Sequence, residues 1–376
     1  MARGLRVMFQ VHLDCLIGQT RSKLWDMGYQ DQRQIGFIKA GLQENRSAPL
    51  QIASQQTLLL RDWWKERPFD VFFFDECHTT AFVRAADRTR NNFPDALYIG
   101  LTATPMRMKK TEGLADHFDL CIAAPVPREL MKLGYLAPMD YYSLPLDFID
   151  LSRVGVRGGD FSTGELGVAC NHPQSIDRCF EEYQKHGKNQ AALIFAVTLD
   201  HAKALASRFD AGGVTTEVVT AKTPSEKRSQ IYSAFKKGEI QALASVNCIS
   251  TGFDVPNATV GIVARPTQSE GLWYQIVGRL MRPAPGKTKG IILDIAGNAW
   301  RFGIPDHIEK YELDFSQLDG TGGPPLKTCE SCGLLNLIFA KVCRGCGAEF
   351  PVIEPKPLDR PLEIYHVGDL PQGNYE

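Results

Sequence analysis

The fold is indicated most clearly by one stretch of the sequence, Phe69-Asp70-Val71-Phe72-Phe73-Phe74-Asp75-Glu76-Cys77-His78. Its apolar run is too short for a helix and rich in Phe, which indicates a β-strand buried on both faces. Two adjacent carboxylates, Asp75 and Glu76, follow where this strand ends. Ligands of open α/β sheets bind at that end of the strands. The pair therefore predicts a catalytic site, although a strand ending in a solvated acidic turn would look the same.

Short apolar runs of the same kind recur along most of the chain. They lie at 6–11, 71–74, 97–101, 191–197, 240–246, 259–264 and 290–295. Stretches of helical character lie between them, at 175–186, 201–209 and 225–236. This alternation of strands and helices predicts an α/β fold of parallel sheets with right-handed crossover connections.

The composition excludes several classes of protein. At roughly 150 residues per domain, 376 residues suggest two or three domains. With 44% hydrophobic and 23% charged residues, a disordered or collagen-like chain is excluded. A net charge of -1 excludes a wholly basic nucleic-acid coat but allows a local basic groove. No run reaches the roughly 18 apolar residues of a membrane helix, and the N-terminus is no convincing signal peptide. We therefore expect a cytoplasmic protein with reduced cysteines.

Three further segments change the interpretation of the acidic pair. They are 101–105 (LTATP), 250–256 (STGFDVP) and 275–282 (QIVGRLMR). In the last one, Gln275, Arg279 and Arg282 are spaced i, i+4 and i+7, which predicts one face of a helix. Two guanidinium groups on one face suit the developing charge of a γ-phosphate. An exposed basic face is the other interpretation of such an arginine pair.

Together these segments resemble the motifs of superfamily-two helicases of the DEAD/DEAH-box class, in a DECH variant. The resemblance extends in the family's order from about residue 6 to about residue 300. Segments 11–20 and 51–58 resemble motifs that contact nucleic acid, and Leu193–Phe195 opens a motif of the second domain. The resemblance implies two RecA-like domains with ATP between them. It also implies nucleic acid held across both domains, for which we expect DNA more than RNA.

The resemblance also implies a role for each matching residue. Catalytic roles fall to Asp75, Glu76, His78, Gln275, Arg279 and Arg282. Contacts to ATP and Mg²⁺ fall to Asp75, Thr102, Thr104, Gly252 and Asp254. Nucleic-acid contacts fall to His12, Gln19, Ser54, Gln56 and Thr57. Asp75 would hold Mg²⁺, Glu76 would orient and deprotonate the attacking water, and the arginines would reach across from the second domain.

The family's phosphate loop, expected upstream of His12, is not found in this sequence. The loop has the pattern G-x-x-x-x-G-K-[ST], and Gly286-Lys287-Thr288 fails it because Met281 stands where the first Gly is needed. We therefore interpret the chain as a helicase truncated at its N-terminal side, with an incomplete first domain. The strand before the loop would lie beside the strand that carries Asp75, so its loss would leave backbone groups unpaired.

The C-terminal region carries two C-x-x-C pairs, Cys329–Cys332 and Cys343–Cys346. Four thiolates suit a closed, tetrahedral, structural Zn²⁺ site, and a segment this short would take much of its folding energy from the metal. Disulfides are the alternative, disfavoured in a reducing compartment. A zinc-dependent hydrolase is excluded because four Cys ligands leave no open metal position.

We expect five segments. An incomplete RecA-like ATP-binding domain would span 1–139 and a RecA-like helicase C-terminal domain 140–318, with a Gly-rich, loop-like stretch at 150–167. A linker at 319–326, a zinc ribbon at 327–350 and a tail at 351–376 would follow. The sequence thus predicts an ATP-dependent helicase or translocase. A nucleic-acid-binding module without turnover is the alternative.

Overall fold

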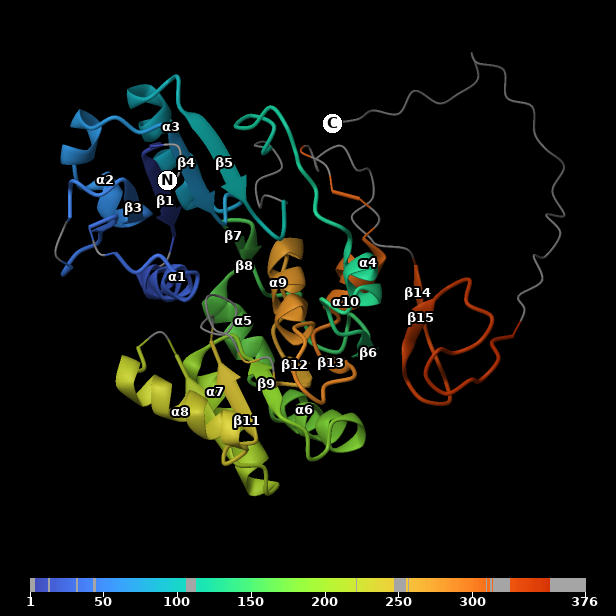
Figure 1. Cartoon of the computed structure of the whole chain (residues 1–376). Helices are drawn as coiled ribbons and strands as arrows, with labels where there is room; N and C mark the ends of the chain where they lie inside the picture. The colour runs from blue at the N-terminus through green and yellow to red at the C-terminus, as the bar shows by residue number, and fades with distance from the viewer. Residues whose placement is uncertain are drawn as a thin grey trace, which may run out of the picture.

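The structure is a computed structural model of the chain. It describes residues 4–12, 14–31, 33–42, 45–105, 113–220, 222–246, 255, 257–308, 310–311, 313 and 325–351. Two separate parallel sheets dominate these residues, and Figure 1 shows the first in blue to teal and the second in green to orange. We call the two sheets with their helices the first and the second α/β unit. The prediction of a parallel α/β fold with two RecA-like sheets is confirmed.

The first sheet has five parallel strands in the order β2-β3-β1-β4-β5. Its strands are β1 (Val7–Val11), β2 (Ile35–Ile38), β3 (Leu50–Ser54), β4 (Val71–Asp75) and β5 (Leu97–Leu101). Its helices are α1 (Asp14–Asp26), α2 (Gln55–Leu59), the 3-10 turn η1 (Trp63–Glu66) and α3 (Thr80–Asn92). Phe72 and Phe74 point from β4 into a core with Phe82 of α3, while Val11 of β1 packs with Ile17 of α1. The sheet is therefore covered on both faces, as the unbroken apolar run predicts.

The first sheet corrects one prediction. β4 pairs with β1 on one side and with β5 on the other, so no place beside the strand of Asp75 is open. The expectation of an additional strand beside β4 is therefore wrong for this sheet. The end strand on this side is β5, whose residues are all at least partly exposed.

The second sheet has six parallel strands in the order β10-β11-β9-β12-β13-β6. Its strands are β6 (Met139–Ser143), β9 (Ala192–Phe195), β10 (Thr216–Val219), β11 (Ala242–Ser245), β12 (Val260–Val263) and β13 (Gly290–Asp294). Its helices are α4 (Pro127–Lys132), α5 (Thr163–Cys170), α6 (Pro173–His186), α7 (Leu199–Ala211), α8 (Ser225–Lys237), α9 (Glu270–Leu280), α10 (Asn298–Phe302) and the 3-10 turn η2 (Pro305–His307). All seven apolar runs predicted as strands are strands, and all three predicted helices form.

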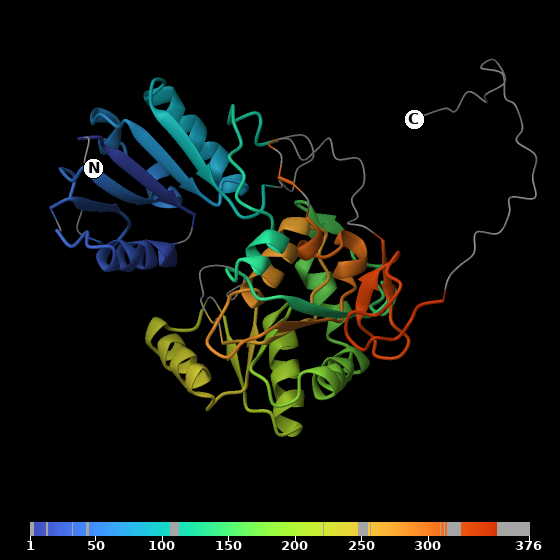
Figure 2. The same ribbon diagram turned by 45° about the vertical axis from the view of Figure 1, so that its right-hand side comes forward.

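Two smaller elements complete the described chain. The Gly-rich stretch 150–167 is not only a loop, because it forms the hairpin β7 (Val156–Arg157) and β8 (Asp160–Phe161) and the start of α5. A C-terminal ribbon contains the antiparallel pair β14 (Leu326–Thr328) and β15 (Leu335–Leu337). Figure 2 shows this ribbon against the second unit, next to β6 and away from the first sheet. None of the helices in the described ranges is long and apolar enough to cross a membrane.

Candidate functional site

The acidic pair lies at the carboxyl end of β4. Asp75 is the last residue of the strand, and Glu76 adopts a left-handed backbone conformation with φ 52°. The turn is fastened to β5 because the backbone N–H of Cys77 donates to the carbonyl oxygen of Leu101 at 3.1 Å. Gly100 allows this approach, since a Cβ there would lie 2.8 Å from the sulfur of Cys77. The strain at Glu76 is typical of a functional turn.

Both carboxylates have raised pKa values. Burial raises the pKa of Asp75. Burial, and then the charge of Asp75, raise the pKa of Glu76 to about 7, whereas the charge of Arg279 acts in the opposite direction. A carboxyl group whose pKa lies near neutrality is matched to the work of a general base. The crowded carboxylates of Asp75 and Glu76 also suit a cation, which would relieve the cost of burying the charge of Asp75.

His78 joins the two α/β units. Its Nδ1 lies 2.9 Å from the hydroxyl oxygen of Thr102, and its Nε2 lies 3.2 Å from Nε2 of Gln275 on α9. The hydroxyl of Thr102 donates to the carbonyl oxygen of Thr104 at 2.9 Å, so it accepts from His78. A neutral His78 with its proton on Nδ1 satisfies every one of these bonds, because Gln275 can then donate to the free Nε2. Nδ1 also lies 3.3 Å from a carboxylate oxygen of Glu76.

Helix α9 carries the arginine segment. Its start is capped by Ser269, whose hydroxyl accepts from the backbone N–H of Leu272 at 3.2 Å. Its apolar face is buried in the core of the second unit through Trp273, Ile276, Val277 and Leu280. Gln275 and Arg279 lie on the face toward the first unit. Arg282 is a correction to the predicted helix face, because α9 ends at Leu280 and Arg282 follows the helix.

These residues line one cleft between the units, with a volume of about 1460 Å³. From the first unit it receives Glu76, Thr102 and Thr104, and from the second Gln275, Arg279 and Arg282. Asp75 lies next to this wall, at the end of β4. The structure thus brings together the residues to which the sequence assigned catalysis. Gly252 and Asp254 lie outside the described residues.

The predicted nucleic-acid contacts lie at the carboxyl ends of two neighbouring strands. His12 follows β1 and Ser54 ends β3, and the two strand ends are in register because Val11 pairs with Ser54. Nδ1 of His12 and the hydroxyl of Ser54 are buried without a hydrogen-bond partner among the described residues, and burial lowers the pKa of His12. Gln56 is exposed, whereas Thr57 is buried. Gln19 lies on α1, but its side chain is outside the described residues.

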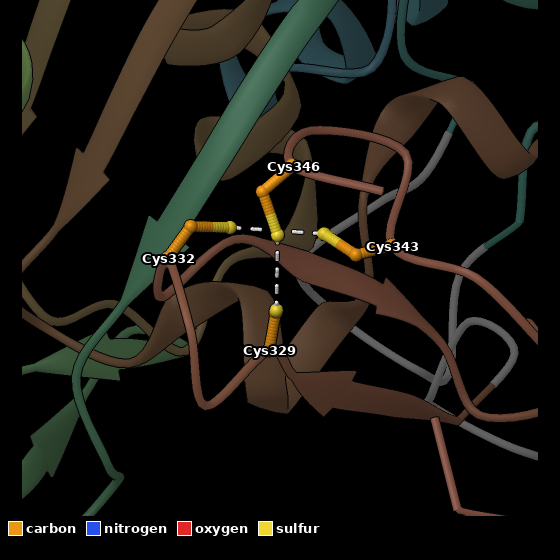
Figure 3. A group of neighbouring side chains, drawn as sticks. All are labelled: Cys329, Cys332, Cys343 and Cys346. Atoms are coloured by element: carbon orange, nitrogen blue, oxygen red, sulfur yellow. Dashed lines mark hydrogen bonds between the residues drawn. The ribbon is translucent and has the colours of Figure 1, made fainter. Parts of the chain in front are cut away.

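The four C-terminal cysteines form one cluster. Their sulfur atoms all lie within 4.8 Å of one another, with 3.6 Å between Cys329 and Cys346 and 3.7 Å between Cys332 and Cys343. Figure 3 shows the four side chains pointing toward a common centre. Zn–S bonds of about 2.3 Å in a tetrahedron place sulfur atoms about 3.8 Å apart, whereas a disulfide needs about 2.05 Å. The cluster is therefore compatible with a Cys₄ metal site.

The surroundings of the cluster contain residues that the sequence analysis missed. The side-chain amide of Asn336 donates to the sulfur of Cys343 at 3.5 Å and to the carbonyl oxygen of Leu334 at 2.8 Å. Burial opposes a thiolate at Cys343, but hydrogen bonds from backbone N–H groups and from Asn336 lower its pKa overall. No pattern in the sequence singles out Asn336, because its position depends on the pairing of β14 with β15.

Comparisons with known proteins identify the family of this arrangement. The model of the helicase conserved C-terminal domain matches residues 173–284, and that of the type III restriction enzyme res subunit matches residues 2–107. The chain belongs to the superfamily-two helicases. A 51.5 kDa protein of a Lactococcus phage is 31% identical to this chain over 356 residues, which cover 94% of the chain and 74% of the phage protein.

Two more distant similarities agree with this assignment. The DNA 3'-5' helicase XPB of Kineococcus radiotolerans is 25% identical over 281 residues, or 70% of this chain and 47% of that helicase. The chain thus spans less than half the length of XPB. A fragment from Vibrio vulnificus YJ016, described as the HsdR subunit of a type I restriction enzyme, has the same fold with a TM-score of 0.57 at 21% identity. It covers 82% of this chain and 55% of that fragment.

Proposed function

We propose that this chain couples ATP hydrolysis in the interdomain cleft to movement along nucleic acid, as a helicase or translocase. The observation that carries the proposal is the position of His78. It bonds to Thr102 of the first unit and to Gln275 of the second, beside the Asp75-Glu76 pair. We also propose that the first domain ends near residue 139 and the second near residue 318. The pairing of β6 (Met139–Ser143) with the second sheet supports the first of these boundaries.

The acidic pair would divide the chemistry of hydrolysis. Asp75 would hold Mg²⁺, whose positive charge would offset the negative charge of the β- and γ-phosphates. Glu76, with a pKa of about 7, would accept the proton of the attacking water. The charge of Arg279 favours the carboxylate form of Glu76, which is the form that a base requires. Thr102 and Thr104 would contact the nucleotide from the same wall, together with Gly252 and Asp254 of the second domain.

The arginines would sense the phosphate from the second unit. Arg279 and Arg282 both line the cleft opposite Glu76. A guanidinium group that approaches the γ-phosphate stabilises the charge of the transition state and draws the two units together. His78 and Gln275 would transmit that closure, because their bond exists only while the units stay in contact. Loss of the γ-phosphate would release the contact, so that each turnover alternates a closed and an open cleft.

Nucleic acid would lie along the strand ends of the first unit, at His12, Gln19, Ser54, Gln56 and Thr57. The buried, unpartnered polar atoms of His12 and Ser54 support this proposal, since such atoms are costly unless a partner satisfies them. DNA is favoured over RNA because the relatives include a DNA 3'-5' helicase and the matched family model is that of a restriction enzyme. Zn²⁺ held by Cys329, Cys332, Cys343 and Cys346 would be structural.

The test is ATP hydrolysis by the purified chain with and without single-stranded DNA. The matched blank is Glu76→Gln, which removes the base and keeps the size of the side chain. We expect DNA-stimulated hydrolysis that the blank lacks. Equal turnover by parent and blank would refute the assignment of Glu76. DNA binding without any turnover would refute the proposed reaction for this chain and leave a binding module.

A further inference from the structure

The cysteine ribbon is built into the second α/β unit. Leu335 of β15 is fully buried and belongs to the same core cluster as Met139 and Tyr141 of β6. Tyr142 of β6 packs against the small core formed by Cys329, Cys343 and Leu334. β6 is the end strand of the second sheet, and β15 contacts it, so the ribbon packs at that edge of the sheet. A separate module tied by a linker would not place a side chain in the core of its neighbour.

Arg344 connects the second C-x-x-C turn to β6. It stands between Cys343 and Cys346, so the path of its backbone is set by how those two sulfur atoms are held. Its backbone N–H donates to the side-chain oxygen of Asn336 at 3.0 Å. The turn itself is exposed, but Nη2 of Arg344 donates to the carbonyl oxygen of Met139 at 2.9 Å. The guanidinium group therefore points from the cysteine cluster toward the second unit.

The next residues along this path are Tyr141 of β6 and Asp306, which form a buried pair. The hydroxyl of Tyr141 donates to the carboxylate of Asp306, and both side chains are buried. Burial raises the pKa of Asp306, whereas the bond from Tyr141 and the charge of Arg344 lower it. Burying a carboxylate is costly unless opposite charge and hydrogen bonds compensate it. Arg344 is thus part of what allows Asp306 to stay buried.

Asp306 belongs to η2, and η2 forms a wall of the interdomain cleft. Pro305 and Ile308 line the cleft, and η2 packs against α4. The turn is short, and its backbone is closed by two hydrogen bonds, from His307 N–H to Ile304 O and from Ile308 N–H to Pro305 O, each 3.1 Å long. A turn this short depends on its side-chain contacts, and Asp306 supplies the buried polar one, beside the buried ring of Pro305.

We propose that Arg344 is a positioning residue through which the cysteine ribbon holds η2, the cleft wall, in place. The path runs from the Cys343–Cys346 turn through Arg344 to Met139 and to the Tyr141–Asp306 pair. The part of the proposal that concerns the metal rests on the proposed zinc site. The ribbon's task on this view lies inside the molecule, in shaping the cleft.

Hydrogen exchange of the full chain tests the role of Arg344 directly. The reporters are the amides of His307 and Ile308. We expect Arg344→Ala to raise their exchange rates about tenfold, as loss of a hydrogen bond from a charged donor does in a local opening equilibrium. Arg344→Lys, which keeps the charge, should restore part of the protection. Lys341→Ala, which removes an exposed cation of the same ribbon, is the matched control and should change neither amide.

Removing the metal gives a second, independent arm. Zinc content is measured first, and a chelator is then added to the full parent chain. We expect the same two amides to lose protection together with residues 326–350, while amides of β9 stay protected. Unchanged His307 and Ile308 exchange in Arg344→Ala would overturn the positioning role. Loss confined to the ribbon on chelation would overturn the coupling, and a chain without bound zinc would refute the metal site alone.

Discussion

The raised pKa of Glu76 makes a prediction about stability. The pKa rises from its ordinary 4.5 to about 7 in the fold, first because the side chain is buried and then because Asp75 is charged. The folded chain therefore holds a proton that the unfolded chain releases between these values. One pKa unit corresponds to about 1.4 kcal/mol, so ionising Glu76 costs the fold about 3 kcal/mol at high pH. The stabilisation that the protonated Glu76 provides is therefore present in full below pH 4.5 and is lost as the pH rises through about 7.

Replacing Glu76 by Gln removes the titration and keeps the shape. We expect the free energy of unfolding of Glu76→Gln, relative to that of the parent, to be about 2.5 kcal/mol higher at pH 8 than at pH 5. The assay is urea unfolding of both chains at the two pH values, and the difference of differences removes every contribution that does not depend on pH. Glu239→Gln, at an exposed surface position, is the control and should show no such difference. A pH-independent effect of Glu76→Gln, or a larger gain at pH 5, would refute the reasoning.

Three further outcomes follow from the described contacts. Leu335→Ala should lower the free energy of unfolding of the second unit by about 2–5 kcal/mol, because a fully buried side chain leaves a cavity, whereas exposed Ile338→Ala should change it little. Calorimetry that finds equal effects would contradict the buried position of the ribbon. Cys343→Ser should abolish bound zinc, measured as metal per chain, and retention of the metal would count against the Cys₄ site. Arg279→Ala should reduce ATP turnover by about 10³-fold or more while leaving DNA binding intact, and a loss below tenfold would exclude an arginine finger.

Much of the fold could be predicted from the sequence because it depends on local pattern. Buried parallel strands are unbroken apolar runs, so β4, β9 and β13 could be recognised without knowledge of their partners. The two C-x-x-C pairs could likewise be recognised as one metal site, because their spacing is typical of zinc ligands. The helix that carries Gln275 and Arg279 has an apolar face that fixes its orientation.

The remaining features depend on distant contacts or on the ends of elements. Asp306 lies far in the sequence from the Cys343–Cys346 turn, and only the packing of β15 against β6 brings Arg344 of that turn near Tyr141 and Asp306. The end of α9 at Leu280 removes Arg282 from the predicted helix face, since helical spacing alone does not mark where a helix stops. The neighbours of β4 were wrongly predicted for a similar reason, because strand order is set by the crossovers and not by the strand itself.

The central claim is that His78 and Gln275 act together to couple hydrolysis in the first unit to the second. A double-mutant cycle of DNA-stimulated ATP turnover, with His78→Ala, Gln275→Ala and the double variant, measures this directly. A neutral hydrogen bond contributes about 0.5–1.5 kcal/mol, so we expect a coupling of about 1 kcal/mol, or roughly fivefold. The double variant should therefore be roughly fivefold more active than the product of the single effects predicts. Single losses that simply multiply, or a parent chain without DNA-stimulated turnover, would contradict the claim.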